Sequence, residues 1–134
     1  MSRKVLVAAL LAASTVGCSK SDVIPVTGVL TLNGQPVADA EVMFNPKTAG
    51  RLAVGKTDAT GHFKLSTGKP DDGAVPGEYA VTLCEYYPPD KPPKMTSGPL
   101  PSRFPQKYGN PSTTPLTVKV EAGGKNEFEF DATK

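Results

Sequence analysis

Side chains that commonly carry chemistry are scarce in this sequence, which has one histidine, two cysteines and one pair of adjacent aspartates. His62 follows a turn that contains Asp58, and this pair suggests a general base or a metal ligand. A zinc site needs three or four ligands, however, and the other donors close in sequence are carboxylates in turns. We therefore expect His62 to be a solvent-facing strand residue.

The adjacent acids Asp71 and Asp72 lie beside Gly73, where loop oxygens could bind calcium. Aspartate is also common in turns, because its carboxylate accepts backbone hydrogen bonds there. No repeated aspartate spacing supports a calcium loop, and no serine lies in a recognisable nucleophile motif. The sequence therefore predicts no catalytic residue, no metal site and no cofactor.

Cys18 ends a distinctive N-terminal segment. Arg3 and Lys4 give this segment a positive start, and residues 5–13 form an uncharged apolar run. The run is shorter than the roughly 20 residues that cross a bilayer as a helix. Its flanks are typical of a secretory signal peptide, which predicts that the rest of the chain is exported.

The residues up to Cys18 resemble a bacterial lipobox, in which Gly17 matches and Thr15 stands where leucine is usual. The resemblance implies that a diacylglyceryl group is added to the Cys18 thiol, in a lipoprotein with acyl chains such as palmitate. It also implies that residues 1–17 are removed as a signal peptide, which leaves residues 18–24 as a lipidated tether. The alternative is an ordinary cleaved signal in which Cys18 is incidental.

Removal of the signal peptide leaves a chain without net charge. Loss of Arg3 and Lys4 reduces the 15 lysines and arginines to 13, against 13 aspartates and glutamates. Because no surplus of cations remains to neutralise phosphates, we exclude nucleic acid as a partner. The predicted partner is membrane lipid, through Cys18. By the sorting rule of proteobacteria, Ser19 favours a cell-envelope location at the outer membrane or periplasmic face.

Cys84 has no partner for an internal disulfide if Cys18 carries lipid. It lies in an apolar, strand-like run, where a free cysteine usually behaves as a small buried apolar side chain. A reactive thiol would need a nearby cation or helix N-terminus, and neither is evident. We therefore expect Cys84 to be structural.

Residues 25–134 form the predicted folded domain. Short runs of alternating apolar and polar residues, separated by glycine and proline turns such as Asn33-Gly34, indicate seven strands, and nothing longer is typical of a helix. This pattern predicts an all-β sandwich, in which one face of each strand packs on the core and the other faces water. The runs cover residues 26–32, 40–44, 52–57, 62–66, 79–84, 116–120 and 126–130.

One long segment, residues 86–115, interrupts this pattern. It contains nine of the 14 prolines, which cannot donate to a strand ladder, and polyproline II is expected around residues 88–93. Loops of this length are commonly functional or disordered. Its aromatic and cationic side chains predict a partner-binding loop, with the alternative that Phe104 and Tyr108 only pin the loop to the sandwich. The binding candidates are Tyr86, Tyr87, Arg103, Phe104 and Tyr108.

Three motifs carry a family resemblance: a G-x-L-x-x-x-G-x-P-V run from residue 28, T-D-x-x-G-x-F at 57–63 and P-G-x-Y-x-V at 76–81. They resemble carboxypeptidase regulatory-like and other transthyretin-like (prealbumin-like) domains, over about residues 26–85. The resemblance implies a seven-stranded Greek-key β-sandwich on a secreted or surface protein, usually without catalytic activity. The rest of the chain looks like small lipoproteins abundant in planctomycete-type bacteria.

The sequence therefore favours a lipid-anchored, non-enzymatic module of the cell envelope, with a structural role or a role in binding protein or glycan. Two alternatives stay open. One is a small secreted hydrolase or metal-dependent enzyme on a transthyretin-like fold, although the enzymes that share this fold use several histidines. The other is an inert spacer without a ligand.

Overall fold

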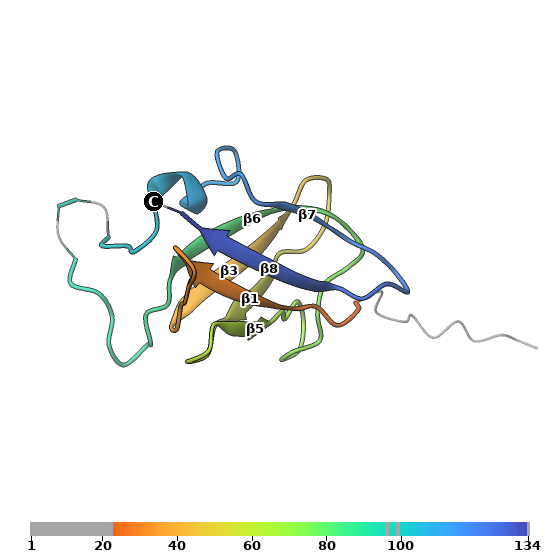
Figure 1. Cartoon of the computed structure of the whole chain (residues 1–134), viewed down its shortest axis with the longest axis horizontal. Helices are drawn as coiled ribbons and strands as arrows, with labels where there is room; N and C mark the ends of the chain where they lie inside the picture. The colour runs from red at the N-terminus through yellow and green to blue at the C-terminus, as the bar shows by residue number, and fades with distance from the viewer. Residues whose placement is uncertain (1–22, 96, 99, 134) are drawn as a thin grey trace, which may run out of the picture.

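The computed structural model describes residues 23–95, 97–98 and 100–133 (Figure 1). Within these residues the chain forms eight strands in two sheets and one short 3-10 helix, which confirms the predicted all-β architecture. The elements are β1 (Thr27–Leu32), β2 (Gln35–Pro36), β3 (Ala40–Pro46), β4 (Ala53–Lys56), β5 (His62–Lys64), β6 (Gly77–Glu85), η1 (Gln106–Gly109), β7 (Thr117–Val120) and β8 (Glu127–Ala132).

The first sheet is built around β1. β8 runs parallel to it along its whole length, from Thr27 opposite Glu127 to Leu32 opposite Ala132. β5 pairs antiparallel with the first half of β1, and the two-residue β2 pairs with its last two residues. Because β8 occupies one edge of β1 completely, β5 and β2 share the other edge.

The second sheet is antiparallel, in the order β4-β3-β6-β7. β3 and β6 form its centre and are in register from Ala40 opposite Glu85 to Pro46 opposite Tyr79. The hairpin of β4 and β5 joins the two sheets at one corner, where Val54 and Ser66 exchange two backbone hydrogen bonds of 3.0 and 2.8 Å. The two sheets are therefore connected at this corner by the chain itself and by backbone hydrogen bonds.

Both sheets contribute to one hydrophobic core, with Phe44 at its centre. The Phe44 side chain is fully buried, and its ring centroid lies 5.7 Å from that of Tyr79, 5.8 Å from Phe128 and 6.0 Å from Phe130. Phe44 and Tyr79 belong to the second sheet, whereas the two other rings belong to β8 of the first. This aromatic cluster therefore spans the space between the sheets, as the alternating pattern predicts.

Gly28 allows aromatic side chains of the neighbouring strands to lie close to β1. It stands opposite Phe63 in β5 and opposite Phe128 in β8. A Cβ on Gly28 would overlap the Phe63 ring and lie 2.6 Å from the backbone oxygen of Phe128. The absence of a side chain at this position is therefore a packing requirement.

The Asn33-Gly34 turn is confirmed, since both residues have positive φ, of 50° and 81°. It leads into β2, which the sequence did not predict because a strand of two residues shows no alternation. The helix η1 was also not predicted. It lies inside the proline-rich loop, where a single turn produces no helical periodicity.

The strand β6 departs from the expected alternation. Tyr79, Val81 and Leu83 point into the core as predicted, but Ala80 and Thr82 on the opposite face are also buried. The Asn45 side chain of the neighbouring strand crosses this face, and its Nδ2 donates to the Ala80 carbonyl oxygen and to Thr82 Oγ1, both at 3.0 Å. The small side chains of β6 are therefore covered by their neighbours rather than exposed to water.

Two expectations about the ends of segments are corrected. Ile24, which was assigned to the tether, exchanges two backbone hydrogen bonds of 2.9 Å with Ala74, so the folded part begins before residue 25. Polyproline II does not extend through residues 88–93, because the Lys91 N–H donates to the Pro88 carbonyl oxygen (2.9 Å) and closes a turn. Proline fits the second position of such a turn, where Pro89 lies.

Candidate functional site

The proline-rich loop leaves the sandwich after β6 and returns through η1 (Figure 1). Phe104 and Tyr108, in its second half, are only 5% and 2% exposed and belong to the hydrophobic core. The Tyr108 hydroxyl also accepts a hydrogen bond from the Thr133 N–H (3.1 Å), just after β8. These two rings therefore pin the loop to the sandwich, as the alternative interpretation expected.

Arg103 is held by Glu85, the last residue of β6. The Arg103 backbone N–H donates to one carboxylate oxygen (2.7 Å), and Nε and Nη2 donate to the carboxylate at 3.0 and 2.7 Å. Nη2 also donates to the carbonyl oxygen of Ala38 (2.8 Å), just before β3. Arg103, predicted as a partner-binding residue, thus ties the loop to two segments of the sandwich.

The charge state of Glu85 reflects this contact. Burial of the carboxyl by itself raises its pKa, but the hydrogen bonds from Arg103 and the guanidinium charge together outweigh burial and lower the pKa below its usual value. A carboxyl with a lowered pKa contributes stability above the usual glutamate value of about 4.3. That stability is lost as the pH falls through the lower pKa of the folded protein.

Replacement Glu85→Gln is expected to loosen residues 86–102, the part of the loop that the contact between Glu85 and Arg103 closes. Because the Arg103 side chain is 45% exposed, we expect a loss of only about 1 kcal/mol in the free energy of unfolding. Trypsin should cleave after Lys94 faster than in the wild type at pH 7, whereas Lys91 precedes Pro92 and is not a trypsin site. The difference in the free energy of unfolding, measured by denaturation, should shrink as the pH falls through the lowered pKa of Glu85, because the wild-type carboxyl is then protonated as well.

The control for this prediction is Glu121→Gln, which removes an exposed ion pair with Lys119 at 3.7 Å. This change should leave both the unfolding free energy and the trypsin cleavage rate within error of the wild type. Equal cleavage of Glu85→Gln and wild-type protein at pH 7 would contradict the role assigned to Glu85.

Tyr86 and Tyr87 are half-buried and line different hollows. The ammonium of Lys56 lies 4.0 Å from the centroid of the Tyr86 ring, a cation–π contact on the side of β4. The Tyr87 hydroxyl instead donates to the Pro101 carbonyl oxygen (2.8 Å). This bond joins the first arm of the loop, which leaves β6 at residue 86, to its second arm, which returns to the sandwich from about residue 100. Of the five predicted binding residues, these two tyrosines and Arg103 line hollows at the loop base without belonging to the core.

A slot of about 410 Å³ lies between the end of β6 and the second arm of the loop. Its lining is mainly apolar, with uncharged polar groups and one charged residue, Glu85. The lining residues are Leu83, Cys84, Glu85, Tyr87, Leu100, Pro101, Ser102, Phe104, Pro105, Gln106, Gly109 and Asn110.

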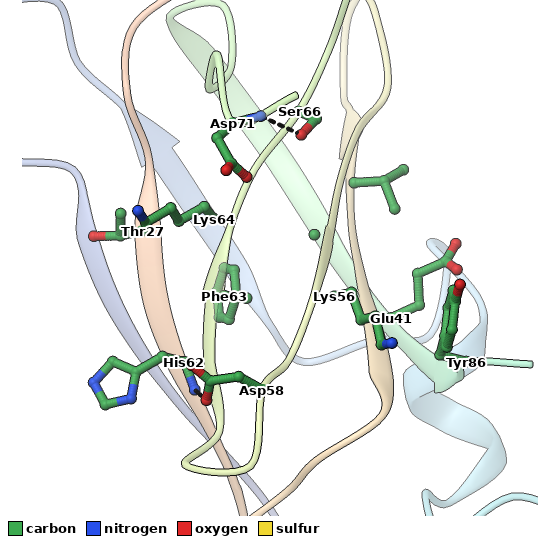
Figure 2. A pocket seen from close by; sticks show the side chains of 12 residues that line it. Thr27, Glu41, Lys56, Asp58, His62, Phe63, Lys64, Ser66, Asp71 and Tyr86 are labelled. Carbon is green, nitrogen blue, oxygen red and sulfur yellow. Dashed lines mark hydrogen bonds between the residues drawn. The ribbon is translucent and has the colours of Figure 1, made fainter. Parts of the chain in front are cut away.

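A larger and more polar groove, of about 810 Å³, follows the corner between β4 and β5. Figure 2 shows Glu41, Lys56 and Tyr86 on the β4 side of this groove and Lys64 on the β5 side, with Phe63 between them. The groove therefore carries charges of both signs around an aromatic side chain. Its polar groups do not form a nucleophile–base pair.

His62 lies at the edge of this groove and points away from Phe63 (Figure 2). It is exposed on β5, as predicted, and its Nδ1 lies 2.8 Å from Thr60 Oγ1. Asp58 accepts hydrogen bonds from the Thr60 hydroxyl (2.7 Å), the Thr60 N–H (2.9 Å) and the His62 N–H (3.1 Å). These bonds, the hydroxyl bond first, lower the pKa of Asp58, so its carboxylate serves the turn.

The Asp72 carboxylate also stabilises a turn by accepting backbone hydrogen bonds. One carboxylate oxygen accepts from the Thr67 N–H (2.6 Å), and the other accepts from the N–H groups of Gly68 (3.0 Å) and Lys69 (2.9 Å). The hydrogen bond from Thr67 is the main cause of a lowered pKa for Asp72, and those from the other two amides add to it. Within the part of the chain that the structure describes, no three histidine, cysteine or acidic side chains are grouped to hold a metal ion.

Cys84 is half-buried at the wall of the slot. Burial raises the pKa of its thiol to about 11, and the nearby charges of Glu41 and Glu85 act in the same direction. The thiol is therefore protonated at neutral pH and a poor nucleophile, which agrees with the structural role expected for Cys84.

Cys18, the predicted signal peptide and most of the tether lie outside the described residues, so lipidation stays a prediction. None of the described helices is long and apolar enough to cross a membrane. The chain matches no protein-family model, and neither the curated proteins nor the solved structures contain a significant match to it.

Sequence reasoning missed Glu85 and the uncharged polar residues of the slot. The signal for Glu85 is weak: a glutamate at the end of an apolar run, and a single arginine in the following loop. Gln106 and Asn110 lie four residues apart in a loop, and no sequence pattern places them beside β6.

Proposed function

We propose that this protein is a lipid-anchored, non-enzymatic β-sandwich module of the cell envelope that binds a partner at the end that carries the proline-rich loop. The anchor rests on the lipobox resemblance that ends at Cys18. A transthyretin-like fold is part of the proposal, supported by the three motifs between residues 28 and 81 and by the presence of two sheets around one core.

The observation that carries this proposal is the position of the loop relative to the start of the domain (Figure 1). Ile24 joins the sandwich just before the first residue of β1. The base of the loop lies at the other end of β1, because Tyr108 bonds Thr133 and the preceding residue, Ala132, pairs with Leu32. A domain anchored before residue 24 would therefore hold its loop away from the anchor.

The test of the anchor is Cys18→Ser in the native host. We expect wild-type protein to pellet with membranes and the variant to be recovered in the soluble fraction, because the lipid is the only predicted membrane contact. Globomycin should cause the lipidated precursor of the wild type to accumulate. Mass spectrometry of the N-terminal peptide should find a diacylglyceryl group on Cys18.

Cys84→Ser is the matched control, since it removes the other cysteine and should leave the protein in the membrane fraction. Membrane association of Cys18→Ser without precursor accumulation would refute the anchor. Nothing in the geometry of the described residues favours the enzymatic alternative, because the imidazole of His62 contacts a threonine in its own turn.

A further inference from the structure

We propose that the slot beside the proline-rich loop is a docking site for an apolar side chain of a partner protein, carried on an acidic segment. This inference rests on the proposed function, since it names the partner chemistry of the same end of the molecule. It concerns the slot between β6 and the second arm of the loop, and not the charged groove of Figure 2.

The slot suits an uncharged, apolar group. Most of its lining is leucine, proline and aromatic side chains, and its one charged lining residue, Glu85, is already paired with Arg103. Its volume of about 410 Å³ falls in the range of about 300–1,000 Å³ that is usual for ligand sites. An ionic ligand would find no unpaired opposite charge among the lining residues.

The surface next to the slot has the composition of a protein interface. Leu100, on the slot wall, is 45% exposed, and Met95, nearer the tip of the loop, is 87% exposed. Tyrosine, methionine and arginine are enriched in protein interfaces, and tyrosine and arginine are common among the residues that contribute most to binding. A sugar ligand would leave this exposed apolar surface without a partner.

The loop is held in place before a partner binds. The Arg103 pair with Glu85, the bond from Tyr87 to Pro101 and the buried Phe104 fix both arms. A segment that is already ordered loses less conformational entropy on association, which favours binding through this surface.

Charge indicates that the partner segment is acidic. Lys91, Lys94 and Lys107 are exposed on the loop and form no ion pair within the described residues, whereas Asp90 is the one acid between residues 86 and 115. Three exposed lysines on the loop that bounds the slot, none in an ion pair, complement an apolar side chain flanked by aspartate or glutamate.

Gly109 offers a way to close the slot without disturbing the fold. It lines the slot, its φ is not positive, and a Cβ placed on it meets no atom within 4 Å. We expect Gly109→Phe to fold like the wild type and to fill the slot. Tyr87→Ala should remove one wall, whereas Tyr87→Phe keeps the ring and loses only the bond to Pro101.

The experiment places the photo-crosslinker p-benzoylphenylalanine at Leu100 of the full chain in living cells. Leu52 is the matched control, because it is a leucine of nearly equal exposure, 44%, in the loop between β3 and β4. That loop follows Pro46, which pairs with Tyr79, far along β6 from Glu85. We expect a discrete protein adduct from Leu100 and none from Leu52.

Mass spectrometry then identifies the cross-linked segment, and a synthetic peptide of that segment serves as the binding probe for the detergent-solubilised full chain. We expect the peptide to contain leucine, isoleucine, methionine or phenylalanine next to aspartate or glutamate. Its affinity should fall at least tenfold with Gly109→Phe and with Tyr87→Ala, and less than threefold with Tyr87→Phe. Tyr86→Ala, in the other groove, should have no effect.

The inference is overturned if Leu100 gives no adduct, if Leu52 gives the same adduct, or if Gly109→Phe binds the peptide as the wild type does. Binding of tetra-N-acetylchitotetraose that depends on Tyr87, without a protein adduct, would overturn it in favour of a glycan. The two proposals can fail independently, because the slot does not require the lipid. If Cys18→Ser leaves the membrane but still forms the adduct, both the anchor and the slot are supported.

Discussion

Phe44→Ala is expected to lower the free energy of unfolding by about 3–5 kcal/mol, the usual cost of removing a buried phenylalanine side chain. Phe44 is fully buried, and its ring contacts Tyr79 of its own sheet and Phe128 and Phe130 of the other. Alanine would leave a cavity between the sheets, which the hydrogen-bonded strands on both sides could close only in part.

Thermal or denaturant unfolding measures this effect. Because a domain of this size has a total stability of about 5–15 kcal/mol, the melting temperature should fall by more than about 10 °C. Leu52→Ala is the control, since Leu52 is 44% exposed and its removal should change the unfolding free energy by less than about 0.5 kcal/mol. Similar losses for the two variants would show that the aromatic cluster is not the centre of the core.

Gly28→Ala should destabilise the protein by about 1–3 kcal/mol or more, although it adds a single methyl group. The added Cβ would overlap the ring of Phe63 and lie 2.6 Å from the backbone oxygen of Phe128. A ring can turn aside, but the backbone oxygen belongs to the parallel ladder between β1 and β8. Relief therefore requires the two strands to separate locally.

Chemical denaturation of the variant measures this cost, with Gly109→Ala as the control because that position has room for a Cβ. The double variant Gly28→Ala with Phe63→Leu distinguishes the two contacts. When Phe63 is already leucine, Gly28→Ala should still lower the free energy of unfolding, because the contact of the added Cβ with the Phe128 oxygen persists. No such loss would mean that only the Phe63 ring limits this position.

Much of the fold could be predicted because its strands show strong local alternation. The strand from residue 40 combines buried Ala40, Val42 and Phe44 with half-buried Glu41 and Met43, and this pattern is visible in the sequence. β2 and η1 could not be predicted, because two to four residues give no period. The burial of Ala80 and Thr82 also escaped prediction, since it depends on the Asn45 side chain of another strand.

The loop base shows a second limit of sequence reasoning. Aromatic residues in a proline-rich segment predict either a binding surface or an internal contact, and the sequence alone does not distinguish them. Phe104 and Tyr108 are buried because η1 packs on the core, and Arg103 is engaged because Glu85 ends β6 beside it. These contacts join residues 18 or more apart in sequence and depend on the assembled sandwich.

The parallel pairing of β1 with β8 has a consequence for the order of synthesis and folding. Thr31 at one end of the chain bonds the Phe130 carbonyl oxygen, 99 residues later. A nascent chain that lacks its last strand cannot complete the first sheet, so no N-terminal fragment gains the stability of the whole domain. The domain can therefore complete its fold only after residues 127–132 have been synthesised.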